Sequence, residues 1–367
     1  MQRNIPPYRA DHVGSLLRPA SLKQARSQHA AGQMTAAELK AIEDAEIGKI
    51  IAKQEQIGLR SVTDGELRRA YWHFDFLAGL DGVEMTEAQG IKFAGVASKA
   101  EAPFVKGKLG SRHHPQIAHF EFLKANTKHT PKMTIPSPSM LHYRGGRNMI
   151  DRAAYPTMEA FYRDLGQAYK KAIGDLYDAG CRYLQLDDCS FAYLCDPAQR
   201  DMLAKRGDDP AKQGEIYAGM INAALEGRPR DLVVTTHVCR GNFRSTFIAS
   251  GGYEPIADLL FNRVNVDGYF LEWDSDRAGG FEPLRFLPKD KTVVLGLITS
   301  KTGAIENKDF IKRRIEEVSK YVPLEQLCLS PQCGFASTEE GNVLAEDEQW
   351  AKLRLVVELA DEIWGRP

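Results

Sequence analysis

The chain of 367 residues lacks the features that mark membrane and secreted proteins. No run approaches about 18 consecutive apolar residues, so the sequence predicts no membrane-spanning helix. The first residues, "MQRNIPPYRADHVGS", lack the apolar core of a secretory signal, and we therefore expect a cytoplasmic protein. Basic and acidic residues nearly cancel, at 48 and 49, which leaves a formal net charge of −1. A chain without a strong field is not expected to bind nucleic acid or an anionic membrane surface.

Cysteine is scarce, and its spacing excludes two common uses of the residue. Six cysteines in a chain of this length do not make a disulfide framework, and a reducing compartment fits them best. No Cys-x-x-Cys pair occurs. The thiols are therefore available as metal ligands or as small core residues: Cys181, Cys189, Cys195, Cys239, Cys328 and Cys333.

What the sequence does contain is an alternation of strand-like and helix-like segments. Helical spacing of apolar residues predicts helices over 35–58, 156–180, 210–226, 304–320 and 345–364. Eight strands alternating with helices predict one catalytic α/β domain over residues 1–367, a single (β/α)8 TIM barrel. The eight predicted strands are 11–16, 60–66, 132–139, 182–190, 232–239, 268–274, 292–300 and 326–334.

One long stretch, from residue 67 to residue 131, interrupts the alternation. The segment "FAGVASKAEAPFVKGKLG" within it has the composition of an added hairpin, and "SRHHPQIAHFEFLKAN" predicts a helix. We therefore expect an insertion over 85–125, a hairpin plus a helix, between the second and third strands of the barrel.

The peptide "TTHVCRGN", residues 235–242, ends an apolar β-branched run. Because side chains two apart on a strand share one face, His237 and Cys239 are expected to project together. Taken alone, this pair fits a buried histidine beside a small core cysteine better than it fits half of a metal site. The interpretation changes only when other strand ends are considered, since active sites of TIM barrels lie there.

Two of those strand ends carry Glu272 and Cys333. One imidazole, one carboxylate and two thiolates match a tetrahedral zinc set, although Asp274 or Glu282 could take the place of Glu272. Ligands scattered over three strands favour a working metal over a structural one. A thiolate-rich set makes zinc a poor activator of water and favours the alkylation of a bound thiol.

The motifs at these strand ends resemble those of a known family. "HVC", a later glutamate at a strand end, and "SPQCGF" resemble the zinc signature of the cobalamin-independent methionine synthases. "VGSLLRP", "VTDGE" and "LQLDD" are similar to that family's other motifs and occur in the same order. The resemblance covers essentially the whole chain, but only the C-terminal catalytic barrel of the two-barrel enzyme. It is closest to the short, single-barrel, methionine-synthase-like branch.

The resemblance implies a zinc-dependent S-methyltransferase that moves a methyl group to the thiol of homocysteine and gives methionine. It implies that Zn²⁺ binds the homocysteine sulfur, and that the carboxylate of Asp187 acts at the catalytic site by binding the substrate amino group. Glu66 would assist Asp187, and Ser15 would receive the substrate carboxylate. Such a site orients an amino acid so that its sulfur meets the metal. The implied zinc ligands are His237, Cys239, Glu272 and Cys333.

Each substrate contact has a less specific interpretation that the sequence leaves open. Asp187 and Asp188 could form a solvated turn, and Glu66 could pair with Arg68 or Arg69 at the surface. Four aromatic residues after the second and fourth strands could stack a flat pterin ring, but such clusters more often pack in a core: Trp72, Phe74, Phe191 and Tyr193.

Two departures from the family pattern concern the methyl donor. The family carries a histidine at the end of the seventh strand, where this chain has Thr299 or Ser300 in "GLITSKTG". The residues after the last cysteine, "GFAST", also lack the family's basic pair. The donor is expected to be a methyltetrahydrofolate or another methyl carrier, and we expect poor use of the folate because a threonine hydroxyl is far too weak an acid to replace an imidazolium.

Other functions remain open at this stage. One is alkyl transfer to a different thiol, as in coenzyme M transferases, and another is a zinc-dependent hydrolase on the same fold. A third is a non-catalytic zinc-binding protein, which would not need substrate carboxylates. The expected partners are homocysteine and a methyl donor, without nucleic acid or membrane, and self-association into a homo-oligomer is left open.

Overall fold

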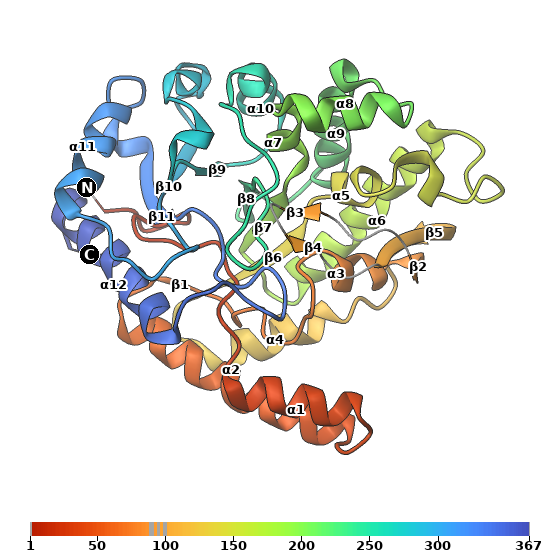
Figure 1. Cartoon of the computed structure of the whole chain (residues 1–367), viewed down its shortest axis with the longest axis horizontal. Helices are drawn as coiled ribbons and strands as arrows, with labels where there is room; N and C mark the ends of the chain where they lie inside the picture. Colours follow the sequence, from red (N-terminus) through yellow and green to blue (C-terminus); the bar gives the residue numbers. More distant parts are fainter. Residues whose placement is uncertain (1, 88–91, 94–95, 98–100, 367) are drawn as a thin grey trace.

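The computed structural model describes residues 2–87, 92–93, 96–97 and 101–366. Its central element is a curled, seven-stranded parallel sheet in the order β1-β6-β7-β8-β9-β10-β11, with helices outside it (Figure 1). Burial of nearly every strand residue is expected where helices cover a parallel sheet. The fold is of the α/β class and is consistent with a TIM-like barrel. The strands are β1 Ser61–Val62, β6 Thr130–Pro136, β7 Tyr183–Asp188, β8 Val233–Val238, β9 Gly268–Glu272, β10 Thr292–Ile298 and β11 Leu327–Pro331.

Seven of the eight expected strands are therefore present, but the prediction of a first strand over 11–16 is wrong. This segment follows a single parallel bridge between Ala10 and Leu329 of β11. The side chain of Asp11 accepts the backbone N–H groups of Tyr8 and His12, at 3.1 and 2.8 Å, so these groups are not paired with a strand. Gly14 has φ +145°, which also departs from strand geometry. The segment still reaches the other edge of the sheet, because the Leu16 N–H donates to the carbonyl of Gly65 just after β1.

All five predicted helices are confirmed, and each lies within its expected range and is one to six residues shorter than that range. The capping box at Thr35 and Glu38 is present and begins the second helix. Four buried residues at helical spacing, from Phe161 to Ile173, pack the long helix α6 against the core. Among the described residues, no helix combines the length and the apolar character needed to cross a membrane. The helices are α1 Ala20–Ala30, α2 Ala36–Gln56, α3 Phe74–Ala78, α4 Gln116–Asn126, α5 Ser139–Tyr143, α6 Met158–Asp178, α7 Ser190–Leu194, α8 Pro197–Lys205, α9 Pro210–Ala224, α10 Ala257–Arg263, α11 Lys308–Val318 and α12 Glu346–Trp364.

Between β1 and β6 the chain leaves the central sheet. Strand β2 (Asp81–Glu87) pairs antiparallel with β5 (Glu101–Gly110), and the short β3 (Lys92–Phe93) pairs with β4 (Val96–Ala97). The helix α4 follows before the chain enters β6. The β2–β5 pair starts at residue 81, and residues 88–91, 94–95 and 98–100 of the expected segment lie outside the described residues. The insertion over 85–125 as a unit stays a prediction.

Candidate metal centre and adjoining pocket

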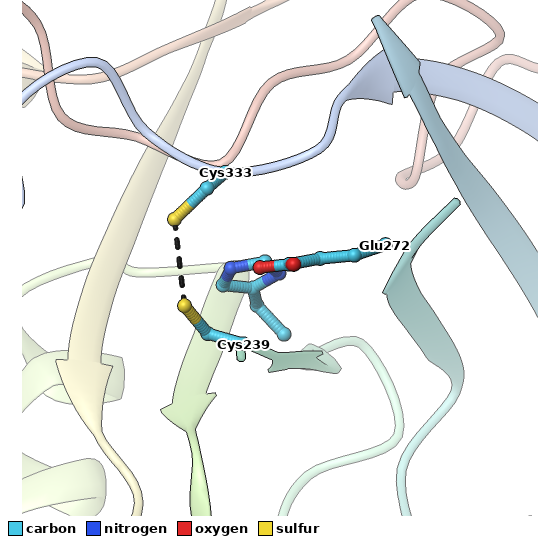
Figure 2. Close-up of side chains that lie close together, drawn as sticks. Cys239, Glu272 and Cys333 are labelled. Atoms are coloured by element: carbon cyan, nitrogen blue, oxygen red, sulfur yellow. Dashed lines mark hydrogen bonds between the residues drawn. The ribbon is translucent and has the colours of Figure 1, made fainter. Parts of the chain in front are cut away.

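Four side chains that the sequence singled out meet at one end of the sheet. One ligand atom from each of them lies within 4.8 Å of the others: His237, Cys239, Glu272 and Cys333. The Sγ atoms of Cys239 and Cys333 are 3.6 Å apart, and Figure 2 shows them facing one another with the carboxylate of Glu272 directed toward the same place. All four residues are buried. Among the described residues, these four form one group of histidine, cysteine and acidic side chains close enough together to hold a metal ion.

Strand pairing explains why residues almost a hundred positions apart meet here. Parallel strands end at the same edge of a sheet, and β8, β9, β10 and β11 are consecutive neighbours. The ladder continues slightly past the strand ends, since the Cys239 N–H donates to Asp188 and the Gln332 N–H donates to Ile298. Gly334 is needed beside Cys333, because a Cβ atom there would lie 2.0 Å from the Oγ of Ser15.

The cluster contains an imidazole whose ring nitrogens form no hydrogen bond of good geometry with the described residues. The imidazole is that of His237, whose side chain is buried. Burial lowers the pKa of His237, but the neighbouring Cys333 and Glu272 outweigh burial, so that the pKa is raised. A buried imidazole that lacks such hydrogen bonds and lies beside two thiols and a carboxylate fits a bound cation, since buried polar groups are otherwise nearly always satisfied.

The two thiols hold their protons in the absence of a cation. A hydrogen bond with Cys189 and burial raise the pKa of Cys239 well above its ordinary value. The hydrogen bond with Cys239 and burial do the same to the pKa of Cys333. A coordinating cation reverses this preference, because a thiol bound to zinc loses its proton. The donor set therefore fits zinc, and its ability to bind the ion is expected to rise with pH.

Glu272 stays charged although its side chain is completely buried. Burial raises its pKa, but Arg277, Lys301 and Arg240 together lower the pKa below the ordinary value. Asp274, the alternative ligand, is instead paired with Arg277, at 2.6 Å between Nη2 and Oδ1. Neither Asp274 nor Glu282 belongs to the cluster of four.

A pocket adjoins the cluster and contains all three expected substrate contacts. Its lining includes Ser15, Glu66 and Asp187 together with three of the four cluster residues. The exception is Glu272, which is fully buried and is not part of the lining. A ligand in this pocket can therefore reach the two thiols, the imidazole and the two carboxylates of Glu66 and Asp187 at once.

Of the three expected substrate contacts, Asp187 is the one that lies directly beside a cluster residue on a neighbouring strand. In the β7–β8 ladder it pairs with His237, so their strands place the two residues side by side. Burial and the nearby Glu66 raise the pKa of Asp187 well above its usual range. Its Oδ1 accepts a hydrogen bond from the Gln185 amide at 2.7 Å. The solvated-turn interpretation is thus wrong for Asp187, because its side chain lies in a buried wall of the pocket.

Glu66 and Ser15 are held by the chain around them. The Nε of Arg69 donates to the Oε2 of Glu66 at 2.5 Å, so the predicted pairing with Arg69 does occur, although inside the pocket wall and not at the surface. Arg69 also donates to the carbonyl oxygen of Ser337, which fixes the loop after Cys333. The Oγ of Ser15 accepts the N–H of Ala336 at 3.4 Å.

Several pocket residues were not anticipated from the sequence. Arg144 lines the pocket, and its Nε donates to the Nε2 of His73 at 3.0 Å. Cys189, one of the six thiols that the sequence leaves open as ligands or core residues, packs in the core and also lines the pocket with Cys239. The sequence does hint at this position, because Cys189 directly follows Asp187 and Asp188 at the end of a predicted strand. No sequence pattern marks Arg144, which follows the short helix α5 and not a strand.

Only some of the residues considered for binding the methyl donor line the pocket. Trp72 and Tyr193 line the pocket, whereas Phe74 and Phe191 are core residues with 5% and 0% exposure. Thr299 does not line the pocket; its Oγ1 accepts the N–H of Lys301, and its own N–H donates to Glu306.

Comparison with known proteins places the chain in a family. Residues 10–362 match the family described as the catalytic domain of cobalamin-independent synthase. Over 361 residues the chain is 52% identical to the uncharacterized protein YxjH of Bacillus subtilis (strain 168), covering 98% of this chain and 95% of that protein. It is 25% identical over 340 residues to the methionine synthase of Saccharolobus solfataricus, with 88% and 86% of the two chains covered.

A solved structure agrees with this assignment. The protein provisionally named a vitamin-B12-independent methionine synthase from Listeria monocytogenes is 44% identical, and its structure superposes with a TM-score of 0.80 over 99% of this chain and 100% of that chain. The chain therefore belongs to the family of cobalamin-independent synthase catalytic domains.

Proposed function

We propose that this member of the cobalamin-independent synthase family is a zinc-dependent methyltransferase that converts homocysteine to methionine. The observation that carries the proposal is the cluster of four metal-binding side chains, adjoined by a pocket that also holds Asp187, Glu66 and Ser15. We also propose that residues 11–16, although they form no strand, close a TIM-type barrel between β11 and β1, and that the protein acts in the cytoplasm.

The chain's own residues supply binding and orientation. His237, Cys239, Glu272 and Cys333 would hold zinc, which when bound supplies a positive centre that favours the thiolate form of a substrate thiol. Asp187 would pair with the substrate ammonium next to the cluster, and Ser15 would receive its carboxylate. The buried walls exclude water from the reacting sulfur, which protects its nucleophilicity.

Two other functions are less well supported by the same residues. A sulfonate thiol such as coenzyme M has no ammonium, so it would leave the buried Asp187 without a cationic group of the substrate to pair with. A hydrolase needs a metal that activates water, and two thiolates with a carboxylate weaken zinc for that role. A non-catalytic zinc-binding protein gives no reason for the pocket carboxylates.

The test is a reconstitution with zinc. Protein loaded with one zinc per chain is incubated with homocysteine and a panel of methyl donors, a methyltetrahydrofolate and methylcobalamin included, and methionine is measured. Homocysteine binding should also release a proton near pH 7.5, because a thiol of pKa about 8.5 loses its proton at the metal. Calorimetry in buffers of different ionisation enthalpy measures that release. Absence of both methionine formation and proton release would contradict the proposal.

A further inference from the structure

We infer that Arg277 is a positioning residue that shares the charge of Glu272 and makes this carboxylate the weakest of the four metal ligands. The inference rests on the proposed metal centre. It concerns the strength with which that centre binds a metal, which depends on the residues around the four ligands as well as on the ligands themselves.

The contacts of Glu272 carry the first step. Its Oε1 accepts the backbone N–H of Arg240 at 3.2 Å, and its Oε2 accepts a guanidinium N–H of Arg277 at 3.2 Å. Each oxygen of this fully buried carboxylate is therefore already engaged by a donor. A metal at the cluster would have to share the electron density of Glu272 with these donors.

Arg277 is itself held in place by several contacts. It lies in the short 3-10 helix Asp276–Ala278, and its side chain is 11% exposed. Its Nη2, which reaches Glu272, also donates to the Oδ1 of Asp274 at 2.6 Å, and its Nη1 donates to the Oγ of Ser275 at 2.5 Å. The guanidinium also packs over the ring of Phe247, at 5.2 Å. The cation is thus shared between two carboxylates, and Asp274 takes the shorter bond.

The position of Glu272 gives this arrangement a use. Among the described residues that line the pocket are the other three cluster residues, but not Glu272. A thiol in the pocket thus meets the imidazole and the two cysteine thiols, whereas the fully buried Glu272 is not exposed to the pocket. Two thiolates and one carboxylate already carry three negative charges against two on zinc, and an incoming thiolate adds a fourth. Because Arg277 remains bound to Glu272, this carboxylate can loosen without becoming an unpaired buried charge.

The inference predicts effects of opposite sign for two neighbouring substitutions. Arg277→Met removes the cation that competes with the metal for Glu272, so zinc should bind more tightly. Asp274→Asn removes the charge that draws Arg277 away, so Arg277 should hold Glu272 more firmly and zinc should bind less tightly. A purely structural role of the pair predicts weaker zinc binding for both variants.

The experiment measures the zinc dissociation constant of the whole protein by competition with a chromophoric chelator, without any substrate. We expect a value about tenfold lower for Arg277→Met and about tenfold higher for Asp274→Asn, the scale of changes seen when groups around metal ligands are altered. Arg277→Lys keeps the cation and should stay within about threefold of the wild type. In the same proteins, the homocysteine dissociation constant should rise in Arg277→Met.

A matched control is available in Arg285→Gln, which breaks an exposed arginine–glutamate pair with Glu254 outside the cluster. Its zinc affinity should equal that of the wild type. Equal zinc affinities in all variants, or a loss in both Arg277→Met and Asp274→Asn, would overturn the inference. If Arg277→Met does not fold, an unchanged or tighter value for Asp274→Asn overturns it as well. A wild-type protein that binds no zinc would instead contradict the proposed metal centre.

Discussion

The two sides of the pocket are built in different ways. On the metal side, the cluster residues belong to strand ends or follow them directly, and the ladder of neighbouring strands sets their spacing. On the substrate side, Asp187 alone lies within a strand, while Glu66 and Arg144 lie in turns and depend on ion pairs and hydrogen bonds made by side chains. The comparison predicts that the loss of one metal ligand has a larger effect than the loss of one contact on the substrate side.

The largest effect is expected from Cys333→Ser. Loss of one thiolate from a set of four should weaken zinc binding by several orders of magnitude, so that the purified variant carries little metal. Metal analysis of protein prepared with excess zinc measures this. Cys328→Ser is the control, because Cys328 is equally buried, donates to the Pro7 carbonyl and is not part of the cluster.

The fold should survive the loss of metal. A chain of 367 residues buries a core large enough to remain stable by itself. Circular dichroism of the Cys333→Ser variant should therefore match that of the wild type. Full zinc occupancy in this variant would show that Cys333 is not a ligand.

The same contrast explains what could be predicted from the sequence. The strand ends could be found, because apolar runs followed by polar residues mark them, and a parallel sheet brings such ends together. His237 and Cys239 share a face by simple alternation, and Glu272 is the last residue of its strand. The first strand was mispredicted because Asp11 satisfies backbone groups with its side chain, an interaction that strand propensity does not register.

Side-chain pairings on the substrate side were harder to foresee. Glu66 has neighbours Arg68 and Arg69, and Arg69 is its partner in the pocket wall because Arg68 pairs with acidic residues of α2. Arg144 enters the pocket from beyond a five-residue helix that no periodicity could reveal. The sharing of Arg277 between Glu272 and Asp274 likewise depends on the path of a short loop.

The next effect concerns the donor. Transfer from methyltetrahydrofolate needs protonation of the leaving nitrogen, and a well-placed acid contributes roughly 10²–10⁴-fold to such a step. Thr299 is too weak an acid, and its hydroxyl already accepts the N–H of Lys301. We therefore expect slower turnover with methyltetrahydrofolate than with methylcobalamin, at fixed homocysteine and saturating zinc. If the rate with methyltetrahydrofolate proves well above the rate with methylcobalamin, the missing histidine does not limit the folate reaction.

Asp187→Asn should weaken homocysteine binding without releasing zinc. The ammonium loses a charge-assisted partner worth about 1.5–3 kcal/mol, which corresponds to about 10- to 150-fold in the dissociation constant. Titration of the zinc-loaded proteins measures it. The des-amino analogue 4-mercaptobutanoate is the control, because it has no ammonium and should not bind the variant more weakly than the wild type.

The pH dependence of binding should depend on Asp187 as well. Burial, and after it the nearby Glu66, raise the pKa of Asp187 well above its usual range, so this carboxyl keeps its proton to a higher pH than an ordinary aspartate does. An ammonium prefers the ionised form, so homocysteine affinity should increase as the pH rises through the pKa of Asp187. The Asp187→Asn variant should lose this part of the pH dependence. Equal slopes for both proteins would mean that another group controls it.

The smallest effect is expected from Glu66→Gln, although Glu66 also lines the pocket and has a carboxyl group like Asp187. The difference is Arg69, whose guanidinium already compensates the Glu66 carboxylate. A substrate ammonium near a neutralised pair gains little, and the glutamine oxygen can still accept the hydrogen bond from Arg69. We expect homocysteine affinity to fall by less than about fivefold, a smaller loss than the one expected for Asp187→Asn. Titration under the conditions used for Asp187→Asn makes the two losses directly comparable. If Glu66→Gln proves the more damaging substitution, the ammonium belongs beside Glu66, and Arg69 must turn away from it when the substrate binds.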